Sequence, residues 1–300
     1  MKNINFTSKF KLGNYFSLFL FLTSVLFIIF KGLNYGIDFK GGTLIELKTD
    51  ESIKIKEIRS TLRSMNLGDV NVKEFGEKNI YLIKIELAAS ETNKKTTEIK
   101  EKLIKNLAAE INFRRVESVG PKVSSELLQS GIIAISLSLA AMLFYIWIRF
   151  EWQFSVGSII ALFHDIVITL GIFSFLSLEI NLSIIAAVLT IVGYSMNDTV
   201  VIYDRVRENL NKFSKIEIYE ISNISINETL SRTIITSLTT LLALFSIFIL
   251  GGEILKGFSF AMILGVVIGT YSSIFVAVPI LKFFKVNYKT LEKKEEKIVP

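Results

Sequence analysis

The sequence predicts an α-helical polytopic membrane protein with six transmembrane helices and one small α+β domain outside the membrane. Hydrophobic residues make up 51% of the 300-residue chain, and its mean hydropathy is +0.50, above the values typical of soluble globular proteins. Six apolar stretches are each long enough to cross a hydrocarbon core of about 30 Å, which takes about 20 helical residues. A long segment of mixed polarity separates the first stretch from the other five.

The predicted spans follow one another closely after the second. They are Tyr15 to Leu33, Ser130 to Ile148, Phe154 to Leu178, Leu182 to Tyr203, Thr233 to Leu250 and Gly257 to Phe284. The first begins with basic residues like a signal peptide, but no small-residue cleavage site follows Phe30, so we expect it to remain as a span. Residues 1–33 then form a cytoplasmic N-terminus and first helix.

The intervening segment, residues 34–129, has the pattern of a separate domain. Strands are expected at Thr43 to Lys48, Val70 to Phe75, Ile80 to Leu87 and Phe113 to Val119, with helices at Ser52 to Met65 and Thr92 to Glu110. Alternating polarity marks the strands and a three-to-four residue apolar spacing marks the helices. The order β-α-β-β-α-β predicts a ferredoxin-like sandwich.

The distribution of Lys and Arg predicts that both termini are cytoplasmic. Basic residues gather in the N-terminal flank, near Arg149, around Arg205 and in the C-terminal tail, whereas the short loops 177–181 and 251–256 hold only Lys256. Short basic loops resist translocation. The domain 34–129 is therefore extracytoplasmic, and the net charge of +6 reflects topology and anionic lipid, since no nucleic-acid motif is present.

Two further regions complete the predicted organisation. Residues 130–284 form a five-helix membrane region that includes a cytoplasmic amphipathic loop, 204–232, in which apolar and charged residues alternate. This loop suits helices at the interface or against a partner, or equally a solvated linker. Residues 285–300 form a charged cytoplasmic tail, and the part after Asn287 is expected to be disordered.

Asp198 is the most informative residue, because it lies inside the apolar stretch Ile180 to Tyr203. An ionised acid within a membrane is costly unless it finds a partner, and such residues commonly mark ion or proton pathways. A carboxylate removed from water can load and release a proton near neutral pH. We expect Asp198 to carry protons; a static hydrogen-bonded or ion-paired role is the alternative.

Arg232 opens the fifth span, while Asp198 lies about 9 Å from the inner end of the fourth at a rise of 1.5 Å per residue. Antiparallel neighbouring helices would bring the two side chains within reach. An ordinary inner-leaflet arginine is the competing interpretation.

His164 and Asp165 fall near the middle of the third span. A histidine beside an acid can form a proton relay, although neighbouring residues on a helix point about 100° apart. Asp165 is therefore a further candidate for the proton pathway, and His164 is left between a relay and a simple hydrogen-bonding role.

Other features of the sequence narrow the function. Gly265 and Gly269 form a GxxxG spacing that favours close helix packing, within the chain or against another subunit. The chain has no Cys and one His, so disulfides and a histidine-based zinc site are excluded. We find no nucleophile, metal or nucleotide motif and expect neither an enzyme nor a bound cofactor.

Several strings together resemble the SecF family, the smaller membrane subunits of the bacterial SecD and SecF pair. They are GIDFKGGTLIEL, VGPKVSSEL, RFEWQF, FHDIVITLG, GYSMNDTVVIYDRVREN and LSRTIITSLTTLLAL, in the family's order from Tyr35 to Leu281. The resemblance implies a place in the resistance-nodulation-division superfamily and use of the proton gradient, without a cofactor, in late translocation and release of preproteins across the inner membrane.

The same resemblance implies partners and site residues. It implies a heterodimer with SecD, contact with the SecYEG channel, accessory subunits such as YajC, and preprotein substrates. In the family the acid of the NDT string and the arginine of the LSRT string are associated with proton passage; here these are Asp198 and Arg232, and Asp165 matches the HD string.

Two other functions remain open at this point. One is a stand-alone proton-driven exporter of lipids or small molecules, although such proteins normally carry larger, duplicated outer domains. The other is a scaffold whose intramembrane polar residues only hold a partner subunit.

Overall fold

The computed structural model describes residues 4–50, 53–65, 67, 70–76, 78–85, 92–107, 111–213 and 215–295. Within these the chain forms two compact units. The membrane unit takes in the chain up to Asn34, Ala134–Leu178 and the chain from Ser183 onward; the small unit takes in Tyr35–Ile133 and Glu179–Leu182.

The six predicted membrane helices are all present in the described residues. They are α1 (Phe10–Lys31, preceded by the 3-10 turn η1, Thr7–Lys9), α5 (Pro121–Arg149), α6 (Trp152–Leu176), α7 (Leu182–Lys212), α8 (Ile218–Leu250) and a sixth span made of α9 (Gly252–Ser272), η3 (Ser273–Ala277) and α10 (Val278–Phe283). Each span is long and apolar enough to cross a membrane. The prediction of a six-span helical protein is confirmed.

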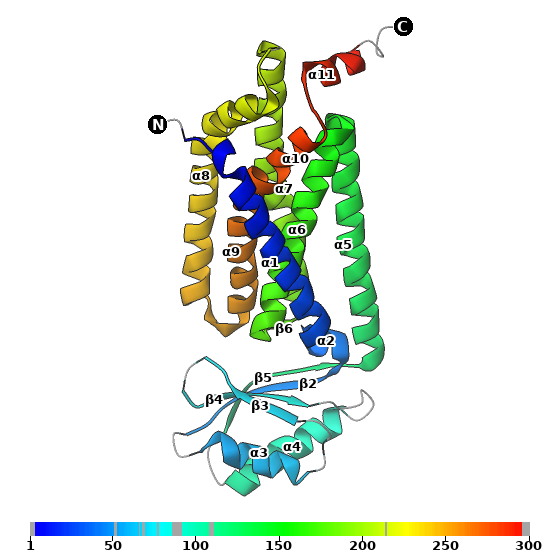
Figure 1. Cartoon of the computed structure of the whole chain (residues 1–300). Coiled ribbons are helices and arrows are strands. Elements are labelled where there is room, and N and C mark those ends of the chain that lie inside the picture. Colours follow the sequence, from blue (N-terminus) through cyan, green and yellow to red (C-terminus); the bar gives the residue numbers. More distant parts are fainter. Residues whose placement is uncertain are drawn as a thin grey trace. The chain divides into compact units, whose positions relative to one another are not determined.

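Burial divides these helices into a centre and a periphery. The most apolar windows of α6, α7 and the sixth span are 56%, 50% and 72% buried, against 11%, 11% and 17% for α1, α5 and α8. Figure 1 shows α1, α6 and α9 running side by side within the membrane unit. Polar residues in α6, α7 and α9 are therefore shielded by protein, whereas the outer helices present apolar side chains outward.

An aromatic cluster joins the centre near the connection of α5 and α6. The ring of Tyr203 lies 5.1 Å from that of Phe154 and 6.3 Å from that of Phe150, and all three are fully buried. The Tyr203 hydroxyl donates to the Ala277 carbonyl at 2.8 Å. Edge-to-face rings combine apolar burial with favourable ring electrostatics.

The segment 204–232 is mostly helical, and its apolar face packs inside the chain. α7 continues to Lys212 and α8 begins at Ile218. Val206, Leu210 and Ile221 belong to the main core and are at most 2% exposed. The predicted amphipathic pattern is correct, but these three residues contact the bundle and not lipid or a partner.

The C-terminal tail is not a disordered segment where it is described. Tyr288–Glu295 form α11, and Val286 and Leu291 join the main core. The prediction of disorder rested on the charged composition and did not take account of these buried apolar side chains. Residues 296–300 of the predicted tail lie outside the described residues.

The small unit has the predicted order of strands and helices. It contains β2 (Gly42–Lys48), α3 (Ile55–Arg63), β3 (Val70–Glu74), β4 (Ile80–Ile85), α4 (Thr92–Leu107) and β5 (Asn112–Val119). β2 pairs antiparallel with β4 and β5, and β3 pairs antiparallel with β4, which gives the sheet order β3-β4-β2-β5. The predicted ends at Ser52, Leu87 and Glu110 lie outside the described residues.

The core of the small unit is made by the inward side chains of the sheet and its two helices. Ile45, Ile83 and Ile85 from the strands and Ile58 and Ile99 from the helices are completely buried. Alternation along each strand supplies one apolar face, and the helices cover it.

A second, shorter sheet in the small unit was not predicted. β1 (Asn34–Tyr35) pairs with β6 (Glu179–Ile180), and the Gly36 amide donates to the Ile180 carbonyl at 2.8 Å. The short helix α2 (Ile37–Lys40) follows, and its Asp38 Oδ2 accepts the backbone N–H of Leu182 at 2.9 Å. Two-residue strands carry too little periodicity to be found from sequence.

Candidate functional site

Asp198 lies buried on α7 with one weak hydrogen bond. Its side chain is 3% exposed, and the Thr270 hydroxyl of α9 donates to Oδ2 at 3.4 Å, near the limit of a hydrogen bond. Thr270 also meets the Ser237 hydroxyl of α8 at 2.8 Å. The three helices thus meet at an acid that is enclosed but poorly satisfied.

Arg232 forms no ion pair with Asp198 in this structure, although it is the charged side chain that interacts electrostatically with it. Within the described residues no ion pair or hydrogen bond of the Arg232 side chain is found. Arg232 instead lines a pocket of about 450 Å³ between α7 and α8, with Asp204, Arg205 and Glu228. The sequence predicted that the two residues would lie in reach; the structure places them near one another without contact.

Asp165 differs from Asp198 because it is fully satisfied. It is 0% exposed, and its Oδ2 accepts hydrogen bonds from Ser195 of α7 at 2.6 Å and from Ser272 of α9 at 2.7 Å. Its Oδ1 lies 2.9 Å from Nδ1 of His164. This acid joins three central helices.

His164 uses only one of its ring nitrogens. Nε2 is buried without a hydrogen-bond partner in the described part of the chain, and the ring is stacked against Phe21 of α1 with centroids 6.4 Å apart. The neighbouring side chains do meet, despite their 100° separation on the helix.

The sixth span changes helix type where it meets these acids. Ser273–Ala277 form a π-helical turn, η3, followed by Pro279 at the start of α10. Pro279 has no N–H to continue the α-helical ladder, and π-turns within helices are often found at functional sites. The change of register starts next to Ser272, which bonds Asp165, and at Ser273, whose hydroxyl lies 2.8 Å from that of Thr199.

The GxxxG glycines allow α9 to approach α7 of the same chain. A Cβ on Gly265 would lie 2.2 Å from Ile191, and one on Gly269 would lie 3.0 Å from Ser195. The predicted packing role is confirmed, and its partner is intramolecular. Gly269 therefore brings the α9 backbone beside the serine that holds Asp165.

Several of these contacts were not singled out from the sequence. Ser195 and Ser237 look like ordinary serines of a membrane helix, and Thr270 and Ser272 look like ordinary small polar residues near Gly269. Only position in the sequence could have pointed to one of them: Ser195 precedes Asp198 by about one helical turn and so lies on the same side of the helix. Among the described residues no group of acids and histidine could hold a metal ion.

Comparison with known proteins identifies the family. The chain is 45% identical over 287 residues to the protein translocase subunit SecF of Rickettsia felis, which covers 94% of this chain and 93% of that protein. The chain belongs to the SecF family. It is also 42% identical over 281 residues to the protein translocase subunit SecF of Cereibacter sphaeroides, across 91% of this chain and 86% of that protein.

Two family models place SecF features along the chain. Residues 99–287 match the model of the protein export membrane protein SecD/SecF, C-terminal, and residues 26–53 match the SecD/SecF GG motif. The first match contains Asp165, Asp198 and Arg232, and the second contains Asp38.

Solved structures of SecDF have the same fold as this SecF-family chain. The crystal structure of SecDF, a translocon-associated membrane protein from Thermus thermophilus, matches with a TM-score of 0.84 and 34% identity, over 94% of this chain. SecDF in a super-membrane-facing form matches with a TM-score of 0.71 and 33% identity. The chain spans about two-fifths of each SecDF chain, 39% and 40%.

Proposed function

We propose that this chain acts with a SecD partner in the inner membrane, where the pair uses the proton gradient to promote late translocation and release of preproteins. Membership of the SecF family supports the place in protein export. One observation carries the proton-dependent part of the proposal: Asp198 is almost completely buried and, among the described residues, it has one long hydrogen bond and the nearby Arg232 has no ion-pair partner.

The three site residues have distinct roles in this proposal. Asp198 takes up and releases the proton, because its carboxylate has only one long hydrogen bond within the described residues to compensate the charge when it is ionised. Arg232 stabilises Asp198 when it is ionised. Asp165 keeps α6, α7 and the sixth span in register through its three partners, so that Asp198 stays enclosed.

The small unit is the extracytoplasmic domain in this proposal, with ferredoxin-like topology, and both termini are cytoplasmic. The antiparallel sheet order β3-β4-β2-β5 with two helices in the order β-α-β-β-α-β supports the topology. The excess of Lys and Arg near the termini and around α7 and α8 supports the orientation.

The partners follow from the family. SecD supplies the second half of the membrane pathway, and the SecYEG channel supplies the preprotein; accessory subunits such as YajC complete the assembly. The outer helices α1, α5 and α8, with their largely exposed apolar surfaces, are the parts of this chain available to lipid and to those partners.

The test is Asp198→Asn in the full chain assembled with SecD in membrane vesicles. Asn keeps the size of the side chain and cannot ionise. We expect preprotein release to lose its dependence on the proton gradient while the complex still assembles. Asp50→Asn, the same change at an exposed position of the small unit, serves as the control and should leave release unchanged.

Each alternative gives a different result. If Asp198→Asn prevents assembly with SecD, the residue holds a subunit interface and the scaffold interpretation replaces this proposal. If gradient-dependent release is unchanged, the proton path does not use Asp198. Gradient-driven export of a lipid or small molecule without SecD would favour the stand-alone exporter.

A further inference from the structure

The pocket beside Arg232 lies on the same stripe of α7 as Asp198. Val201 and Arg205 line it and follow Asp198 by three and seven residues, spacings that return to one face of a helix. On α8, Glu228 and Arg232 line it from positions four residues apart. The pocket of about 450 Å³ therefore gives the Arg232 side chain room to move along α8.

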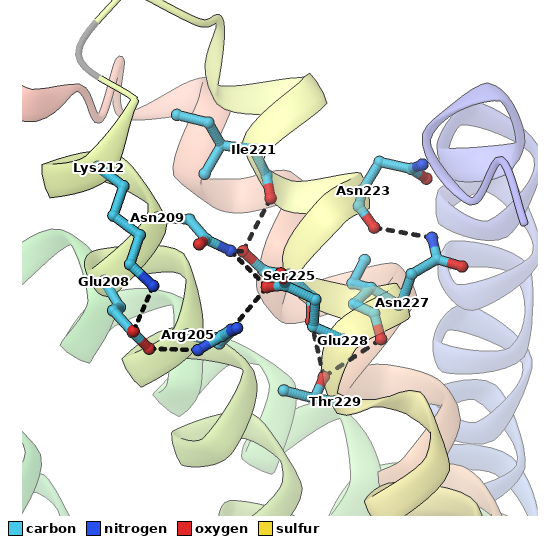
Figure 2. Close-up of polar contacts among 11 residues, drawn as sticks. Arg205, Glu208, Asn209, Lys212, Ile221, Asn223, Ser225, Asn227, Glu228 and Thr229 are labelled. Carbon is cyan, nitrogen blue, oxygen red and sulfur yellow. Dashed lines mark hydrogen bonds and ion pairs between the residues drawn. The ribbon is translucent and has the colours of Figure 1, made fainter. Parts of the chain in front are cut away.

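Glu228 is held by α7 through one of its two oxygens. Arg205 Nε donates to Glu228 Oε2 at 2.6 Å, and Asn209 Nδ2 donates to the same oxygen at 2.7 Å. Asn209 also donates to Ser225 at 3.0 Å. Figure 2 shows these groups of α7 and α8 facing one another. Within the described residues Glu228 Oε1 has no partner, so the carboxylate is fixed in position with one oxygen still able to accept a hydrogen bond.

The arrangement leaves Arg232 without the partner that its spacing favours. A glutamate four residues before an arginine is a favourable helical pair, yet Glu228 is paired with Arg205 instead. Arg205 also pairs with Glu208, and Glu208 is further bound by Lys212 at 2.6 Å. Arg205 thus keeps Glu208 as a second carboxylate partner. Glu228 can therefore bind another cation while it remains near Arg205.

We propose that Glu228 is the alternate partner of Arg232. While Asp198 is ionised, Arg232 faces it; when Asp198 takes up a proton, its attraction for the guanidinium ends and Arg232 turns back one helical turn to Glu228 Oε1. Release of the proton reverses the movement. Glu228 is a positioning residue in this scheme, and the scheme rests on the proposed role of Asp198.

The charged groups around the pocket are consistent with movement of Arg232 between Asp198 and Glu228. Arg232 is faced by Glu228 on its own helix and by Asp198, Asp204, Arg205 and Glu208 on α7. Asp204 is paired with Arg149 of α5 at 2.8 Å. Both oxygens of Glu208 are bound by cations, whereas Asp198, the second oxygen of Asp204 and Oε1 of Glu228 are open to Arg232 among the described residues. Of these, Glu228 alone lies on the same helix as Arg232, at the favourable four-residue spacing.

The experiment compares Glu228→Gln with Glu220→Gln in the full chain assembled with SecD. Glu220 is exposed, lies on the same helix and is remote from the pocket. We expect Glu228→Gln to slow gradient-driven preprotein release by about fivefold, the factor expected for one partly exposed ion pair. Its pH profile should shift toward lower pH, because Arg232 then stays with Asp198 and more protons are needed to displace it. Glu220→Gln should behave like the wild type.

Exchanging the charges of Arg205 and Glu228 tests whether Glu228 positions Arg232 or whether the pair only holds α7 against α8. The double variant Arg205→Glu, Glu228→Arg retains an ion pair between α7 and α8 but places a cation beside Arg232. We expect it to assemble and yet fail to restore gradient-driven release. If it restores the wild-type rate and pH profile, the pair only holds the helices and the proposal is overturned.

Measurement of Asp198→Asn in parallel distinguishes the two proposals. If that variant keeps gradient-dependent release, the proton role of Asp198 fails, and the exchange fails with it. If it loses that dependence while Glu228→Gln keeps the wild-type rate and pH profile, the Glu228 proposal alone is rejected.

Discussion

The Thr270 hydroxyl of α9 donates to Asp198 of α7 across 3.4 Å and also meets Ser237 of α8 at 2.8 Å. This is the only hydrogen bond to the Asp198 carboxylate within the described residues. A change in the charge of Asp198 therefore alters a contact between α7 and the sixth span, and through Ser237 a contact with α8.

Thr270→Val removes this donor while keeping the shape of the side chain. Loss of one weak hydrogen bond corresponds to about 0.5–1.5 kcal/mol, so we expect gradient-driven release to change by about threefold or more with assembly retained. Thr239→Val is the control, because Thr239 is exposed and its hydroxyl bonds only within its own helix. Equal effects of the two changes would contradict a specific role for Thr270.

Asp165→Asn should destabilise the protein far more than Asp198→Asn. Asn has one acceptor oxygen where Asp165 has two, so its amide would face either the Ser195 and Ser272 hydroxyls that now donate to Oδ2 or Nδ1 of His164, which must then accept. A buried donor without an acceptor costs about 1–3 kcal/mol. Thermal stability of the two variants in detergent measures this, and Asp165→Asn as stable as Asp198→Asn would show that the network does not hold the helices.

Gly171 is a site where α1 and α6 approach closely. A Cβ there would lie 2.2 Å from Ser24 Cβ and 2.6 Å from Ser24 Cα, so Gly171→Ala must move the α1 backbone. We expect a loss of about 1–3 kcal/mol, typical of an overpacked contact. Gly193→Ala on α7 has nothing within 4 Å of the new Cβ and should leave stability unchanged or raise it slightly, because Ala favours a helix more than Gly. The same thermal assay reports both.

The sequence was sufficient to predict the features that depend on hydrophobic periodicity and on burial in the membrane or in a protein core. Length and hydropathy located the six spans, and strand alternation located β2 to β5, because both follow from which faces must be buried. Asp198 stood out because an acid in hydrocarbon is costly. These are local properties of the chain.

Contacts between particular side chains were harder to predict from the sequence. Arg232 was expected to reach Asp198, but whether it pairs depends on side-chain positions that helix spacing leaves open. The Asp165 network depends on Ser195 and Ser272, whose partners lie far away in sequence. The α11 helix was missed because a single buried residue, Leu291, packs it against the main core despite its charged composition.

Tyr81 links the sheet of the small unit to the segment that precedes α3 and provides a pH-dependent test of that unit. Its side chain is 3% exposed, and its hydroxyl donates to the Ile53 carbonyl at 3.0 Å. Burial, and then the nearby Glu74 and Glu57, raise the pKa of Tyr81 above its usual value of 10.0. A raised pKa in the folded state means that stability is fully present below about pH 10 and is lost as pH rises through the folded pKa.

Tyr81→Phe should therefore have two effects. At pH 8 it loses the hydrogen bond, at a cost of about 1 kcal/mol, and local opening should increase about fivefold. Above about pH 10 the phenylalanine variant should lack the additional opening that ionisation of Tyr81 causes. Because the chain has no Cys, Val72→Cys, at a buried position of β3, provides a single thiol whose labelling rate, divided by that of the urea-unfolded chain, measures opening. The same rise above about pH 10 in both forms would place the titrating group elsewhere.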